Sequence, residues 1–73
     1  MKWELWDEDS ANLLGDFDDR TEAIRVAAEL IAANRDPSGF VLLALDQQGQ
    51  VVGSIAGVEL ATEATRIRRA AFA

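Results

Sequence analysis

Apolar and polar residues alternate in two short segments near the start of the chain. In Lys2–Trp6, Trp3 and Leu5 share one face of a strand, and a second alternating segment covers Leu13–Phe17. Between them, Asp7–Asn12 is rich in Asp, Ser and Asn, which form turns because their side chains bond to the nearby backbone. The pattern therefore predicts an N-terminal β-hairpin.

Alternation divides each of these strands into two faces, and one helix can cover only one of them. In the first strand Trp6 lies on the same face as Lys2 and Glu4, and in the second strand Leu14 lies on the same face as Asp16. Trp6 and Leu14 are therefore predicted to point away from the first helix, and we take them as candidate interaction residues.

A helical pattern follows the hairpin. Asp18 is placed to cap a helix over Asp18–Arg35, and Pro37 cannot continue it. The apolar residues expected to face the sheet are Ala23, Val26, Ala27, Leu30 and Ile31. The residues expected on the opposite side are Arg25, Glu29 and Ala32.

The next segment, Gly39–Asp46, is apolar at every position from Phe40 to Leu45. A strand that is apolar on both faces belongs inside a layered fold, because each exposed Leu or Val forgoes about 1.5–3 kcal/mol of burial. We therefore predict a central strand covered on both sides. The turn "QQGQ" then leads to a fourth predicted strand, Val51–Ala56.

A second helix is predicted after Gly57, which interrupts the strand pattern. Its narrow apolar stripe consists of Leu60, Ala64, Ile67 and Ala71. The element order is therefore ββαββα, in a single α+β domain over residues 1–73. A right-handed crossover from the second strand to the third gives a four-stranded antiparallel sheet in the order 2-1-3-4.

Two arrangements would cover the second face of this sheet. In the first, the C-terminal helix crosses that face and closes a three-layer monomer. In the second, it packs beside the first helix, and the exposed face meets a second copy of the chain in an isologous dimer. We favour the homodimer, because one short helix rich in Ala has too little side-chain volume to cover Trp6, Leu14 and a full strand.

The residue types that most catalytic and metal sites require are scarce. The chain has no Cys, no His and no Tyr, and its single Lys is Lys2. Turn and cap positions explain most of the clustered carboxylates in "DEDSANLLGDFDD". A calcium-loop alignment fails there, because Ala11 and Asn12 occupy positions that need an oxygen ligand and a glycine. We expect no enzymatic activity, no cofactor and no bound metal.

The net charge of −6 limits the classes of partner. It opposes non-specific attraction to nucleic acid and to anionic lipid, and it favours a basic protein partner. The N-terminus turns acidic within seven residues, and no apolar run approaches the ~20 residues that span a bilayer. The sequence therefore predicts a cytoplasmic protein that contacts no membrane, and its richness in Ala and Arg is typical of a GC-rich bacterial genome.

Charge is also distributed unevenly along the chain. Residues 1–63 hold thirteen acids and four cations, whereas the tail holds Arg66, Arg68 and Arg69 and no acid. Cations at a helix C-terminus complement its dipole, which is the simpler explanation. Alternatively, the three arginines contact nucleic acid or an acidic partner, as in a small antitoxin-like regulator. In a third interpretation the acidic surface mimics nucleic acid and blocks a basic protein.

The motifs "WELWD", "NLLGDFD", "EAI" and "GQVV" are similar to those of a loose group of small uncharacterised bacterial ββαββ domains. These domains share an aromatic-led first hairpin, a Gly-x-Phe-Asp junction from strand to helix, and an Asp-x-x-Gly turn before the last strand. The resemblance covers residues 2–56. It implies the same architecture, and it carries no activity or functional residue over to this chain.

Overall fold

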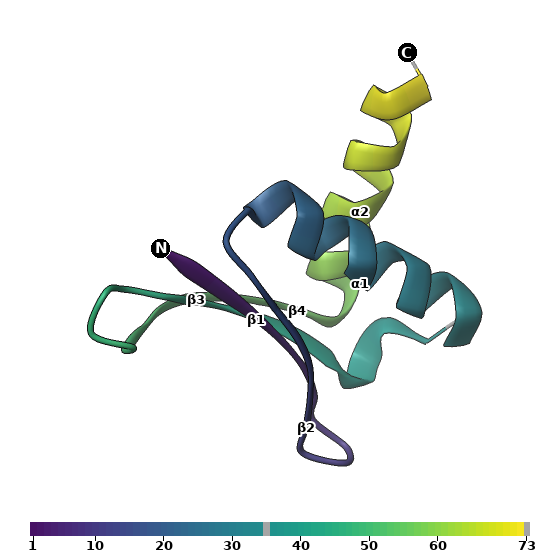
Figure 1. The fold of residues 1–73 in the computed structure, drawn as a ribbon. Helices are drawn as coiled ribbons and strands as arrows, with labels where there is room; N and C mark the ends of the chain where they lie inside the picture. The colour runs from purple at the N-terminus through teal and green to yellow at the C-terminus, as the bar shows by residue number, and fades with distance from the viewer. Residues whose placement is uncertain (35, 73) are drawn as a thin grey trace.

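The four strands and two helices follow one another along the chain in the predicted order, with a short 3₁₀ helix before the third strand. The computed structural model describes residues 1–34 and 36–72. The elements are β1 (Lys2–Asp7), β2 (Asn12–Phe17), α1 (Arg20–Asn34), the short 3₁₀ helix η1 (Pro37–Gly39), β3 (Phe40–Leu45), β4 (Val51–Ala56) and α2 (Gly57–Phe72) (Figure 1). The α+β assignment is confirmed.

The four strands form one antiparallel sheet in the order β2-β1-β3-β4, which confirms the order predicted from the handedness of the crossover. β1 and β3 are the central strands, and β2 and β4 are the edges. The strand that is apolar on both faces therefore lies where the sequence places it, inside the sheet.

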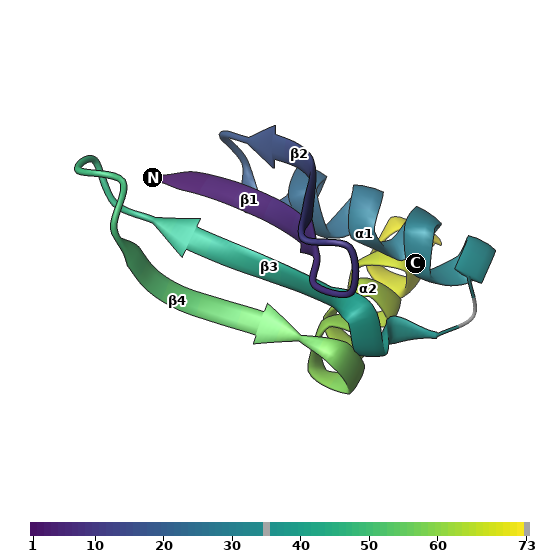
Figure 2. The same cartoon turned by 90° about the horizontal axis from the view of Figure 1, so that it is seen from below.

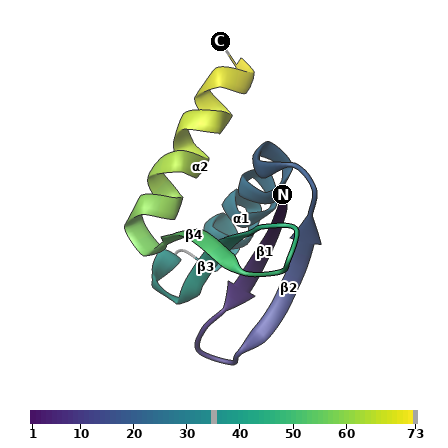
Figure 3. The ribbon, with the colours of Figure 1, turned by 90° about the vertical axis from the view of Figure 1, so that its left-hand side faces the viewer.

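Both helices lie on the same face of this sheet. α1 contacts β1, β2 and β3, while α2 contacts α1, β3 and β4. Figure 3 shows the two helices together on one side, and Figure 2 looks onto the other side, with the strands in front of the helices. The closed three-layer monomer is therefore wrong. Within the part of the chain that the structure describes, no element covers the second face.

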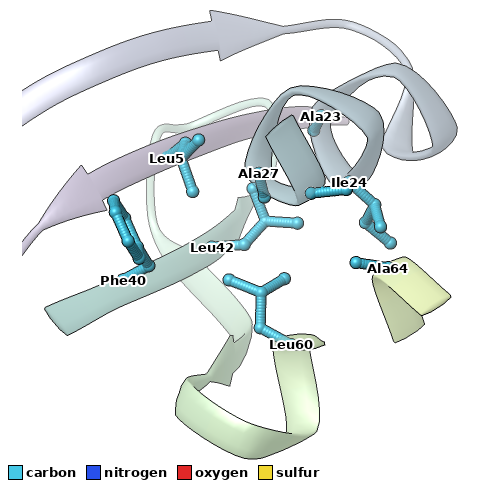
Figure 4. Packing of buried hydrophobic residues seen from close by; sticks show 9 residues of the cluster. Leu5, Ala23, Ile24, Ala27, Phe40, Leu42, Leu60 and Ala64 are labelled. Carbon is cyan, nitrogen blue, oxygen red and sulfur yellow. The ribbon is translucent and has the colours of Figure 1, made fainter. Parts of the chain in front are cut away.

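The hydrophobic core lies between the helices and the sheet. Leu5 and Leu42 come from the central strands, Ile24 from α1 and Leu60 from α2, and all four side chains are fully buried (Figure 4). The sequence analysis missed Ile24. The predicted stripe is wide enough to cover the sheet alone, whereas α1 also packs on α2 and therefore buries a broader face.

Asp19, and not Asp18, caps the N-terminus of α1. Its carboxylate accepts a hydrogen bond from the Glu22 N–H at 3.1 Å, and its carbonyl oxygen accepts one from the Ala23 N–H at 3.1 Å. Two adjacent aspartates compete for this role, and the capped N–H groups select the second of them. The expectation for Asp18 was therefore wrong by one residue.

Aspartates also organise the turns at both ends of β3. The Asp46 carboxylate accepts from the backbone N–H groups of Gln48 and Gln50, each at 2.9 Å, and closes the β3–β4 turn. Before β3, the Asp36 carboxylate accepts from the Ser38 N–H at 3.0 Å. This hydrogen bond holds the pKa of Asp36 below its ordinary value of 3.8. These contacts explain acidic residues that would otherwise be candidates for chemistry.

The β1–β2 turn contains a backbone conformation that its residue disfavours. Ala11 has φ of 57°, in the left-handed region. That conformation costs a non-glycine residue about 1–2 kcal/mol, while glycine loses about 0.5–1 kcal/mol more chain entropy on folding.

We expect Ala11→Gly to raise the free energy of unfolding by about 0.5 kcal/mol, measured by thermal melting. Ala33→Gly, on the exposed side of α1, should lower it by about 1 kcal/mol, and a matching loss at both sites would contradict the strain at Ala11.

Candidate interaction surface

The sheet face opposite the helices, here called the open face, is built from three rows of side chains that run across the strands. The strand register defines the members of each row. The first row is apolar and consists of Leu13, Trp6, Val41 and Ala56. The second consists of Asp16, Glu4, Leu43 and Ser54. The third consists of Lys2, Leu45 and Val51.

The centre of the open face is apolar and already closely packed. Val41 is only 8% exposed although no helix covers it, so its neighbours in the sheet bury it. Trp6, Leu43 and Leu45 are half-buried. Further apolar side chains lie toward both edges of the sheet and are more exposed, namely Leu13, Leu14, Val51 and Val52. The open face therefore has a well-packed apolar centre and exposed apolar side chains toward its edges.

The polar groups of the open face are gathered over β1 and β2. The Trp6 indole N–H donates to the Glu4 carboxylate at 3.2 Å, so the polar atom of Trp6 is satisfied and its ring is held in place. Lys2 forms an ion pair with Asp16 at 3.7 Å, and both side chains are more than half exposed. Such a pair contributes little to stability, so its effect is mainly to neutralise this corner of the face.

Trp6 and Leu14 are not direct neighbours across the hairpin. The register shifts between Leu5 and Trp6, so that Leu5 pairs with Gly15 and Trp6 pairs with Leu13. Leu14 is the extra residue of this bulge and is exposed. Without the bulge, the pairing of Leu5 with Gly15 would place Trp6 opposite Leu14, and a bulge of this kind leaves no clear mark in the sequence.

The predicted tail arginines Arg66 and Arg69 differ in their contacts. Arg66 forms an ion pair with Glu63 at 3.2 Å, and Glu63 also accepts from Arg20 of α1 at 3.4 Å. The Arg20 guanidinium lies 5.9 Å from the centre of the Trp3 ring, at a distance suited to a cation–π contact. Arg66 therefore belongs to a polar cluster that joins α2, α1 and β1. Part of its charge is already matched.

Arg69 lies in a shallow hollow of about 320 Å³ on α2, lined by Thr62, Thr65, Arg66 and Arg69. Both threonine hydroxyls donate to backbone carbonyls one turn earlier, so they bond within the helix. The side chain of Arg68, the third predicted arginine, lies outside the described residues. The hollow is basic, but it is formed by one face of a single helix.

The acidic N-terminal hairpin loop has a structural role at Asp7, whose carboxylate accepts from the Asp9 N–H at 3.1 Å. Among the residues that the structure describes, no three acidic side chains converge in a group that could hold a metal ion. Neither helix, over its described length, is both long and apolar enough to cross a bilayer. The open face is thus the most distinctive surface feature of the described chain.

Comparisons of this chain with protein-family models, with curated proteins and with solved structures each give no match.

Proposed function

We propose that the protein is a non-enzymatic interaction module that forms a homodimer through its open face. The observation that carries the proposal is the placement of both helices on one side of a sheet whose central strand is apolar on both sides. In the dimer, the open faces of two copies pack against each other, and the helices form the two outer layers.

The size of the open face is that of a small dimer interface. A stable interface buries about 800 Å² on each partner, which is roughly one sixth of the 4849 Å² surface of this chain. Four strands of six residues, about 4.8 Å apart and rising about 3.4 Å per residue, give a face of about 400 Å² in projection, to which the exposed side chains at its edges add. Two such faces pack about 10 Å apart with interdigitating side chains, as in a β-sandwich.

Charge also favours the open face over other surfaces for self-association. Two copies that each carry a charge of −6 repel one another, so their contact must be poor in unmatched acids. On the open face, Lys2 neutralises Asp16, and the Glu4 carboxylate accepts a hydrogen bond from the Trp6 indole but keeps its charge. The remaining acidic side chains of the described strands and turns lie mainly in the loops at the ends of the sheet.

The two regulatory alternatives have weaker support. Contact with nucleic acid through the tail would have to compete with the Glu63–Arg66 ion pair, and it would use a hollow formed by one helix. Mimicry of nucleic acid requires an ordered array of carboxylates, whereas Asp7, Asp19 and Asp46 accept backbone hydrogen bonds in turns and a cap.

The dimer is tested by replacing the aromatic residue of the apolar row. Trp6→Ser should weaken self-association about 30-fold, because a central aromatic residue typically accounts for about 2 kcal/mol of an interface. Sedimentation equilibrium over a range of concentrations gives the dissociation constant. Val58→Ser is the matched control, since Val58 is 76% exposed and belongs to α2. A chain that sediments at 7.9 kDa at every concentration, or that responds equally to both changes, would refute the proposal.

A further inference from the structure

We propose that the edge strand β4 pairs with β4 of a second copy, antiparallel and with Ser54 opposite Ser54, to form a continuous eight-stranded sheet. This contact uses the edge of the sheet and does not depend on the open face. Three observations support it: the lack of charge along β4, its exposure, and the order of large and small residues within it.

The first observation is the lack of charge. Residues 47–58 form the longest uncharged run in a chain whose residues are 27% charged, and this run contains all of β4. Proteins usually protect an edge strand from pairing with a charged side chain, above all Lys, or with Pro. The other edge, β2, carries Asp16. For a chain of net charge −6, β4 is the edge that two copies can bring together without repulsion.

The second observation is exposure. Val51 and Val52 are 56% and 55% exposed, and Ser54 and Ala56 are also exposed. The outer edge of β4 offers the backbone N–H and C=O groups of alternate residues to another strand. A bulge between Ala44 and Leu45 lies near the start of β4 and leaves Gly53–Ala56 in regular register.

The third observation selects a second copy as the partner. With Ser54 on a twofold axis, Gly53 of one copy lies opposite Ile55 of the other, within the regular part of β4. The smallest residue of β4 thus faces its largest. The space over Gly53 is open on its own side of the sheet, since a Cβ built on Gly53 itself would meet only the Ala44 Cβ, at 3.9 Å. Shifting the pairing by two residues would place Gly53 opposite Gly53 and lose this fit.

Edge pairing and face packing are compatible in one assembly. The edge pair has its twofold axis perpendicular to the sheet, whereas face-to-face packing has its axis parallel to the sheet. Where these two perpendicular twofold axes intersect, they generate a tetramer with 222 symmetry. The two contacts can therefore be removed one at a time, and each leaves a dimer.

A single cysteine tests the register, because the chain has none of its own. Directly opposed residues of antiparallel strands have Cα atoms about 4.5–5.5 Å apart, within the reach of a disulfide. Ser54→Cys is made together with Leu43→Glu, which places a charge in the open face and removes packing through it. Under mild oxidation this variant should give at least about tenfold more covalent dimer than Leu43→Glu with Gln48→Cys, whose thiol lies in the exposed β3–β4 turn. Equal yields would overturn the proposal.

The mass of the assembly gives an independent readout. Leu43→Glu alone should sediment as a dimer at high concentration, and adding Val52→Lys should convert it to a monomer, because a lysine would lie at the edge itself. If Leu43→Glu is already monomeric, the edge contact is refuted while the open face stands. If Leu43→Glu and the wild type have the same mass of two chains, the edge contact stands and the open face fails.

Discussion

Replacing Leu42 by Ala should lower the free energy of unfolding by about 2–5 kcal/mol, because it removes a fully buried side chain from the centre of the core. Leu42 comes from the central strand β3 and shares its cluster with Leu5 and Leu60. A domain of 73 residues has a total stability of only about 4–11 kcal/mol. At 37 °C, a substantial fraction of the Leu42→Ala molecules should therefore be unfolded.

The control is the next residue on the same strand. Leu43 lies on the open face and is half-buried, so Leu43→Ala should cost the isolated chain only about 1 kcal/mol. Urea unfolding followed by tryptophan fluorescence measures both variants. Since self-association adds stability that depends on protein concentration, the comparison is made by extrapolation to low concentration. Equal losses at the two positions would mean that the second face is covered as fully as the first.

The strand order could be predicted from the sequence because it depends on features that act locally or through topology. β3 has no polar residue between Phe40 and Leu45, which places it inside the sheet, and a right-handed crossover then leaves one simple order. The details that were missed depend on contacts formed only in the folded chain. Ile24 is buried because α2 lies beside α1, and the bulge near Trp6 arises from pairing between two strands.

The sequence left the position of α2 open, and the structure explains why. The stripe of Leu60, Ala64 and Ile67 would fit either face of the sheet equally well. The outcome depends on the junction, where β4 ends at Ala56 and α2 begins at Gly57 with no connecting loop and a φ of 58°. The glycine signals a break in the strand pattern, but the presence of a glycine does not determine toward which face of the sheet the chain turns.

The open face could be predicted only in part for the same reason. Alternation correctly assigned Trp6 to the face away from α1, because no irregularity precedes it in β1. The small side-chain volume of the Ala-rich second helix also favoured a second face that this helix leaves uncovered. Alternation did not predict that Leu13 would join the apolar row, because the extra residue in β2 shifts every cross-strand pair beyond it.

Leu43→Glu should have the largest effect on self-association. Leu43 occupies the middle row of the open face, between Glu4 and Ser54. Because the dimer is isologous, one substitution places two new carboxylates in the same contact, next to two copies of Glu4. Burying like charges together costs several kcal/mol, so the dissociation constant for face packing should rise by at least about 100-fold.

The appropriate control carries the same charge elsewhere. Val58→Glu also changes the net charge of the chain from −6 to −7, but it adds a carboxylate to the first turn of α2, where the helix dipole favours it. If self-association were governed by overall repulsion between acidic molecules, both variants would weaken it equally, and salt would restore both. Contact through the open face requires a loss at Leu43 that salt does not restore, because the cost there is the burial of a charge rather than repulsion at long range.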